Sequence, residues 1–191
     1  STTQVVTRIK ILSKIMAALR VLLVFPLLAA LRVEATGKCN KDIINKILAS
    51  NNCPFGVLAK LSNMGVFTQA VLPTVEVSDA VDCFSGFVYP PFGPFARARA
   101  NIFFKDTSLR MVNYYQQEQS CGQLIESYEG GQYNIYFLNI DDTSATYYRC
   151  VDDENAVGED FGGCVIPVSK AQDPAAKAAI ASCKQTLADV G

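Results

Sequence analysis

The sequence predicts an all-β fold, an eight-stranded up-and-down antiparallel barrel with a C-terminal α-helix and a short N-terminal helix. Three observations lead to this prediction. Residues 64–168 form a series of eight short segments, rich in aromatic and β-branched residues, with turn residues between them. No helical crossover interrupts the series, so consecutive strands pair antiparallel. A capped helical pattern follows the last segment. A β-sandwich is the alternative that this pattern leaves open.

Turn residues and two-residue alternation set the expected strands. Alternation of apolar and polar side chains is clearest in 97–102 and 134–140. The separators include the Pro-Pro-Phe-Gly-Pro run at 90–94 and the glycine pair at 130–131. The eight strands are expected at 64–72, 83–89, 98–105, 108–118, 121–127, 132–140, 143–150 and 163–168.

Helices are expected on both sides of the strand series. Residues 42–49 place Ile43, Ile44, Ile47 and Leu48 on one face. Near the C-terminus, Asp173 is a candidate N-cap and Pro174 follows at the first helical position. The run 175–187 then carries apolar residues along one stripe, so we expect this helix to pack on the barrel wall.

The N-terminal 35 residues resemble a targeting segment. Arg20 precedes an uncharged run at 21–31, and Ala35 provides a small residue for cleavage. The run is shorter than the roughly 20 residues that a membrane span requires, and a buried or amphipathic helix is the alternative. The sequence therefore predicts a targeting segment at 1–35, a short cysteine-containing helical stretch at 36–62 and the barrel domain at 63–191.

Composition excludes several classes of function. The chain has seven cysteines, all after residue 35, but it has no CxxC pair and no histidine. Disulfides are therefore expected rather than a zinc site, and we expect no metal and no bound cofactor. The missing histidine also removes Ser-His-Asp and Cys-His catalysis. Residues 36–191 carry twelve basic and seventeen acidic side chains, so nucleic acid is not an expected partner.

The sequence near the end of the strand series resembles the lipocalin domain of violaxanthin de-epoxidases. The run 147–150 is Tyr-Tyr-Arg-Cys, and after a loop containing Asn155-Ala156 and Glu159-Asp160 the chain continues as Phe-Gly-Gly-Cys at 161–164. That family has a Tyr-Tyr-Arg strand, an Asn-Asp-Ala loop and an aromatic-Gly-Gly strand. Gly65-Val66-Phe67 resembles the Gly-x-Trp with which lipocalins begin their first strand, with Phe67 as the aromatic plug. Residues 79–83 resemble the stretch that leads into the second strand of the de-epoxidase domain.

The resemblance implies a lipocalin-like barrel that binds a carotenoid, a xanthophyll or a similar small apolar ligand. It implies location in the plastid thylakoid lumen, with secretion as the alternative, and association with a membrane surface or a pigment protein. A de-epoxidase-type oxidoreductase using ascorbate as co-substrate is a second hypothesis. In that case Tyr148 matches the family's tyrosine, whereas the family's aspartate is missing and Glu129 or Glu126 is the substitute. A ligand-free structural or partner-binding barrel is the third hypothesis.

Alternation then assigns the expected ligand-binding residues. If Tyr148 faces inward, so do Thr146 and Ser144, whereas Tyr147 faces outward. Further candidates for the lining are aromatic residues on other strands, namely Phe67, Phe103, Tyr115 and Tyr136.

The cysteine pairing is the last expectation. Cys150 and Cys164 stand on neighbouring antiparallel strands where the de-epoxidases have Gly and Ala, so we expect a disulfide across this hairpin. Cys39–Cys53 is expected to hold the N-terminal helix. The remaining cysteines provide one more bridge, assigned to Cys83 and Cys183, and one odd thiol, Cys121. Cys39–Cys150, the pairing of insect and crustacean lipocalins, is the alternative.

Overall fold

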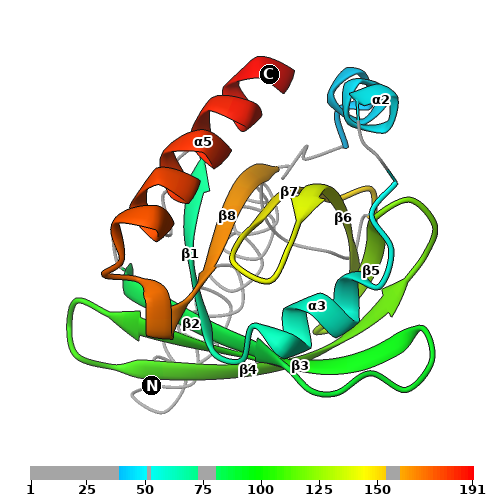
Figure 1. Ribbon diagram of the computed structural model, residues 1–191. Helices are drawn as coiled ribbons and strands as arrows, with labels where there is room; N and C mark the ends of the chain where they lie inside the picture. The colour runs from blue at the N-terminus through cyan, green and yellow to red at the C-terminus, as the bar shows by residue number, and fades with distance from the viewer. Residues whose placement is uncertain (1–38, 51–52, 73–80, 154–159) are drawn as a thin grey trace, which may run out of the picture. The chain divides into compact units, whose positions relative to one another are not determined.

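A computed structural model describes residues 39–50, 53–72, 81–153 and 160–191 (Figure 1). By its internal contacts the chain divides into two units, 1–36 and 37–191. The expected targeting segment at 1–35 lies outside the described residues. None of the described helices is long and apolar enough to cross a membrane.

Eight strands form one closed antiparallel barrel, as the sequence predicts. Each strand pairs with the next, and β8 pairs with β1 through six residue pairs, which closes the sheet and excludes the sandwich. β3 begins three residues earlier than expected, because the chain pairs with β4 directly after Pro94. The strands are β1 (Phe67–Leu72), β2 (Val81–Val88), β3 (Phe95–Phe104), β4 (Leu109–Glu118), β5 (Gln123–Tyr128), β6 (Gly131–Ile140), β7 (Ala145–Cys150) and β8 (Phe161–Pro167).

A short helix, α3 (Val57–Asn63), covers one end of the barrel, and the sequence pattern did not predict it as a separate helix. Its apolar residues Val57, Leu58 and Leu61 are buried in the same core as the inward side chains of the strands. Gly56 precedes the helix and has no capping side chain. Glu118, at the end of β4, accepts hydrogen bonds from the backbone N–H groups of Val57 (2.9 Å) and Leu58 (3.3 Å) instead. A carboxylate at a helix N-terminus is favourable.

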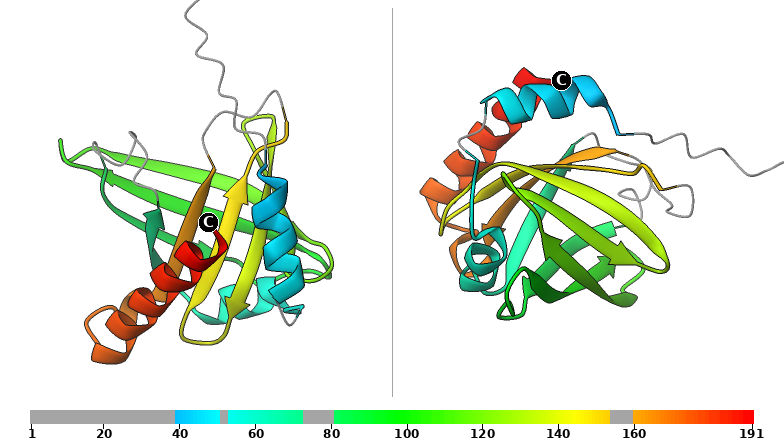
Figure 2. Two further views of the ribbon diagram at one scale, coloured as in Figure 1. Left: turned by 90° about the horizontal axis from the view of Figure 1, so that it is seen from above. Right: turned by 90° about the vertical axis from the view of Figure 1, so that its right-hand side faces the viewer.

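Two longer helices lie outside the barrel beside β6, β7 and β8 (Figures 1 and 2). They are α2 (Lys41–Ser50) and α5 (Pro174–Val190), and both confirm the expected helices within a few residues. A 3₁₀ turn, η1 (Val168–Lys170), connects β8 to α5. The middle of α2 contacts the C-terminal end of α5, where Lys46 Nζ donates to the carbonyl of Val190 at 3.0 Å. Consequently β7 and β8 are buried on both faces.

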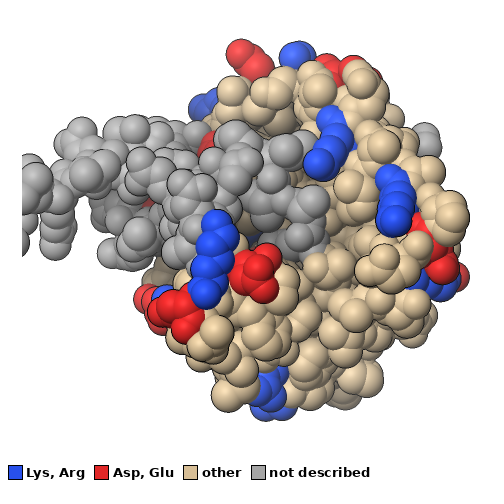
Figure 3. Space-filling view, turned by 90° about the vertical axis from the view of Figure 1, so that its left-hand side faces the viewer, with Lys and Arg blue, Asp and Glu red and all other residues tan. Residues whose placement is uncertain are grey.

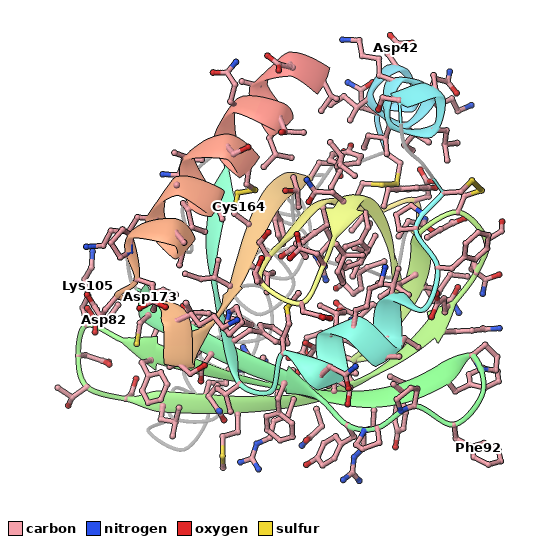
Figure 4. All side chains as sticks on the ribbon, viewed as in Figure 1. Asp42, Asp82, Phe92, Lys105, Cys164 and Asp173 are labelled. Atoms are coloured by element: carbon pink, nitrogen blue, oxygen red, sulfur yellow. A yellow bond between two sulfur atoms is a disulfide. The ribbon has the colours of Figure 1, made fainter. Side chains whose placement is uncertain are left out.

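α3 covers one end of the barrel, and the β3–β4 and β5–β6 turns lie at the opposite end. Figure 4 shows Asp82 and Lys105 at the latter end, far from Phe92. We refer to the end at the β3–β4 turn as the mouth.

On the face in Figure 3, the described lysine and arginine side chains are separated by mainly uncharged surface.

The predicted Cys150–Cys164 disulfide is wrong. In the β7–β8 register Cys164 lies opposite Thr146, four residues along β7 from Cys150. At about 3.3 Å per residue this offset is about 13 Å, which a disulfide cannot span. Cys164 instead faces α5 and bonds to Cys183 (Figure 4).

The predicted Cys39–Cys53 and Cys83–Cys183 bridges are also wrong. The ten residues of α2 separate Cys39 from Cys53, and a helix of that length spans about 15 Å. Cys39 bonds to Cys150, the pairing that was the alternative, with Cα atoms 4.9 Å apart. Cys53 bonds to Cys121. Cys83 is the free thiol and is exposed on β2.

Candidate functional site

Two adjacent glycines of β8 determine what β7 places inside the barrel. A Cβ on Gly163 would lie 2.1 Å from Cζ of Tyr147, so only glycine leaves room for that ring. A Cβ on Gly162 would lie 2.7 Å from Leu187 of α5. Gly163 therefore makes room for a side chain on the inner face of the sheet, and Gly162 makes room for one on the outer face. Tyr147 faces inward and Tyr148 faces outward, the reverse of the prediction.

The barrel interior contains a cavity of about 270 Å³ that extends from α3 toward the mouth. Its lining is mainly apolar, and a few polar side chains stand among the apolar ones. The residues that line it are Leu61, Phe67, Phe84, Val88, Ala100, Ile102, Arg110, Val112, Tyr114, Gln116, Glu126, Tyr128, Ile135, Phe137, Tyr147, Arg149, Phe161 and Val165.

Three polar side chains from adjacent regions of the wall form one hydrogen-bonded group in this lining. Arg149 donates to Oε1 of Glu126 from Nη2 (3.0 Å) and from Nε (3.3 Å). Gln116 donates from Nε2 to the other carboxylate oxygen, Oε2, at 3.3 Å. The side chains of Arg149 and Glu126 are only 15% and 12% exposed. The pair therefore sits in a shielded environment, where charge pairing matters most.

Aromatic rings hold the guanidinium of Arg149 in place. Its Cζ lies 3.7 Å from the ring centre of Tyr133 and 5.4 Å from that of Phe161. A guanidinium over an aromatic face is attracted by the ring quadrupole. These contacts, with the two hydrogen bonds to Glu126, fix the position of the cation in the wall near the mouth.

Gln116 carries an acceptor that the described residues leave unused. The residue is 6% exposed, and its Oε1 is buried without a hydrogen-bond partner in the described part of the chain. The amide orientation follows from chemistry, because a carboxylate only accepts and the NH₂ group must therefore face Glu126. The carbonyl oxygen Oε1 is therefore the atom of this amide that accepts no hydrogen bond from the described residues.

Two tyrosines provide further polar groups in the cavity wall. Burial raises the pKa of Tyr114, and the nearby charge of Glu126 raises it further. Burial likewise raises the pKa of Tyr147. Both hydroxyls therefore stay protonated at ordinary pH and keep a hydrogen that can be donated.

The predicted catalytic residue Tyr148 lies on the outer face of β7, beneath α2 and α5. Its hydroxyl donates to Oδ2 of Asp160 (2.6 Å) and accepts from the backbone N–H of Asn40 (3.1 Å). Burial, followed by the hydrogen bond to Asp160, raises the pKa of Tyr148. Thr146, also predicted to face inward, is buried on this outer face opposite Cys164. Tyr148 thus contacts the residues just before α2, and neither Tyr148 nor Thr146 lines the interior cavity.

Of the other predicted lining residues, Phe67 is in the cavity wall and the remaining three are outside the barrel. Phe67 is 5% exposed and packs in the core as the expected plug. Phe103 and Tyr115 are exposed on the outer face of β3 and β4. Tyr136 packs outward with Tyr148 beneath α2. In each of these strands a neighbouring residue takes the inward position.

The second catalytic candidate, Glu129, stands at the β5–β6 turn. It forms an exposed ion pair with Arg110 at 3.0 Å and does not line the cavity. Glu126, the other glutamate named from the sequence, is inside the barrel. Sequence reasoning missed Gln116, Tyr114 and Arg149 as lining residues. Arg149 was predictable in principle, because it shares a strand face with Tyr147, but the two buried faces of β7 gave no alternation to show which face was inward.

The described residues contain no cluster of side chains suited to holding a metal ion. The closed up-and-down barrel, with an interior cavity and a helix against its outer wall, is the lipocalin fold.

Comparison with solved structures agrees with this class. The chain is 19% identical to apocrustacyanin C2 and to lobster apocrustacyanin A1, with TM-scores of 0.51 and 0.52. It is 18% identical to apocrustacyanin C1, with a TM-score of 0.52. Each match covers 79% of this chain and 82% of the other. No family model and no curated protein matches the sequence. These likenesses show the fold.

Proposed function

We propose that this protein binds a small apolar ligand inside the barrel. The observation that carries the proposal is the mainly apolar interior cavity with its few converging polar groups, which is the usual character of small-molecule sites. The polar groups are held by one another, as in the Arg149–Glu126–Gln116 group, so the site is formed before a ligand arrives. A preformed site limits the ordering that binding requires.

The cavity volume restricts the size of the ligand. At about 270 Å³ it is slightly below the range of roughly 300–1,000 Å³ that is typical of ligand pockets. A compact terpenoid, or the cyclic end group of a carotenoid whose chain leaves through the mouth, fits this limit. The sequence resemblance to xanthophyll-binding lipocalin domains supports the carotenoid version of the proposal.

The geometry favours binding over de-epoxidation. Tyr148 is turned toward α2 and α5, and Glu129 is exposed at a turn, so neither candidate reaches a ligand in the cavity. The three disulfides support an oxidising location, and we propose the thylakoid lumen, with an extracellular location as the alternative. The membrane-surface or pigment-protein association also remains a proposal.

The test is titration of the protein with β-ionone and with retinol, followed by quenching of tyrosine fluorescence, because the chain has no tryptophan. Val112 and Asn113 are neighbours on β4 and provide a matched pair of variants. Val112 lines the cavity, whereas Asn113 is exposed on the outer face. Val112→Phe fills the cavity and should weaken binding at least tenfold. Asn113→Phe should leave the affinity unchanged.

Absence of saturable binding to either ligand would refute the proposal. Equal binding by the wild type and Val112→Phe would refute it too, because the ligand would then occupy another site. Circular dichroism of both variants checks that the barrel is intact.

A further inference from the structure

Gln116 lines the cavity and has an unused acceptor, which no interaction in the wall explains. Oε1 is buried and has no partner among the described residues, while Nε2 of the same amide is held by Glu126. A buried acceptor left without a donor costs about 1–3 kcal/mol. A side chain fixed at one end and unsatisfied at the other, in the wall of a cavity, is suited to receive a donor from the ligand.

We propose that the ligand carries a neutral hydroxyl group, which donates its hydrogen to Oε1 of Gln116. This inference rests on the proposed function and adds the chemical class of the ligand. A carbonyl, ether or ester oxygen cannot satisfy Oε1, because such groups only accept. The ligand is therefore an alcohol with a compact apolar skeleton.

The charges of the lining disfavour a cationic donor such as an ammonium group. Arg149 and Arg110 line the cavity together with a single acidic residue, Glu126. The carboxylate of Glu126 is already occupied by three N–H donors from Arg149 and Gln116. Arg110 is likewise paired with Glu129. A cation in the cavity would therefore find two arginines in the lining and a carboxylate that already accepts three hydrogen bonds, whereas a neutral hydroxyl requires no counter-charge.

The same hydroxyl can also use its acceptor oxygen. Tyr114 precedes Gln116 by two residues on β4, so both face inward, and both line the cavity. The raised pKa of Tyr114 keeps its hydroxyl protonated and able to donate. An alcohol is then recognised through both its hydrogen and its oxygen, and the apolar wall accommodates the remainder.

The experiment compares β-ionol with β-ionone, which share one skeleton and differ in an alcohol or a ketone. Isothermal titration calorimetry of the wild type should give at least tenfold tighter binding of the alcohol. Gln116→Met removes the acceptor at similar size and should reduce this preference to about one. Gln117→Met is the matched control, because the neighbouring side chain is outside the cavity lining, and it should keep the preference.

The possible results distinguish failure of the proposed ligand binding from failure of the hydroxyl inference. If neither compound binds, the proposed function itself is wrong. If the wild type binds both compounds equally, the barrel binds ligands but the hydroxyl inference is wrong, and a water molecule then satisfies Oε1. A preference that survives Gln116→Met also overturns the inference. The wild-type comparison decides the question even where Gln116→Met does not fold.

Discussion

At the scale of single residues, the Phe-Gly-Gly run at 161–163 is explained by packing on two sides of one strand. Gly163 leaves space for the ring of Tyr147 inside the barrel, and Gly162 leaves space for Leu187 of α5 outside it. A pattern that the sequence offers as a family resemblance therefore has a local physical cause. At these two positions the core and the outer helix both pack directly against the backbone of the strand.

Gly163→Ala should destabilise the protein by about 1–3 kcal/mol, because overpacking forces Tyr147 out of its position. Urea unfolding followed by circular dichroism measures the change. Adding Tyr147→Leu to Gly163→Ala should recover part of the loss, since the smaller side chain removes the clash. If the double variant is no more stable than the single one, the clash with Tyr147 is not the cause.

The buried Arg149–Glu126 pair gives a second prediction at this scale. Arg149→Met leaves the carboxylate of Glu126 without its cation and should cost about 3–5 kcal/mol. The double variant Arg149→Met with Glu126→Leu should be considerably more stable than Arg149→Met alone, because no unpaired charge remains. The measurement is denaturant unfolding of the wild type, of Arg149→Met, of Glu126→Leu and of the double variant. A double variant that loses as much as the sum of the two single losses would show that the pair is not coupled.

At the scale of elements, three disulfides join segments outside the strands to the barrel. Cys39–Cys150 joins the start of α2 to the end of β7, and Cys164–Cys183 joins β8 to α5. Cys53–Cys121 joins the approach to α3 to the residues before β5. Each bridge connects a helical segment to a strand region, so the two outer helices and the closed end of the barrel are all fixed to the sheet.

Removing these bridges should destabilise the protein in order of loop length. Cys39 and Cys150 are 111 residues apart, whereas Cys164 and Cys183 are 19 apart. Loop-closure entropy assigns about 4.7 kcal/mol to a loop of roughly 100 residues and about 3 kcal/mol to one of roughly 15. The variant with serine at 39 and 150 should therefore melt below the variant with serine at 164 and 183.

Peptide mapping without reduction provides the direct check on this pairing. Iodoacetamide applied to the native, unreduced protein should label Cys83 alone. A peptide that links Cys150 to Cys164, or labelling of any other cysteine, would contradict the arrangement.

At the scale of the whole molecule, buried tyrosines make stability depend on alkaline pH. Burial raises the pKa of Tyr114, Tyr147 and Tyr148 above the value of an exposed tyrosine, which is about 10. Because the folded state holds these protons more tightly, their contribution is complete below about pH 10. It decreases as the pH rises from there toward the higher values of the folded state.

The protein should accordingly lose stability above about pH 10, and these three tyrosines should ionise only as it unfolds. Tyrosinate absorbance and circular dichroism recorded in one alkaline titration measure both events. The denatured chain in guanidinium is the control, since all eight tyrosines should titrate there near their ordinary pKa. Complete ionisation of all eight residues in the folded barrel would contradict this prediction.

The sequence by itself determined the strand series and the two outer helices, whereas closure of the barrel was decided by the pairing of β8 with β1. These features depend on local turn chemistry and on periodicity, which neighbouring residues supply. The plug residue of the first strand, Phe67, was expected from the family resemblance of Gly65-Val66-Phe67 instead, and it packs in the core. α3 was missed because its seven residues are too short for a clear helical period.

Only the tertiary structure decided which face of each strand is the interior and which cysteines are bonded. β7 is buried on both faces, because α2 and α5 cover its outer side, so the sequence 145–150 carries no alternation to distinguish Tyr147 from Tyr148. A one-residue error in that choice exchanges every side chain between the cavity and the outside. The pairing of Cys164 with Cys183 depends on strand register and on where α5 packs, and both are set by contacts between residues far apart in the sequence.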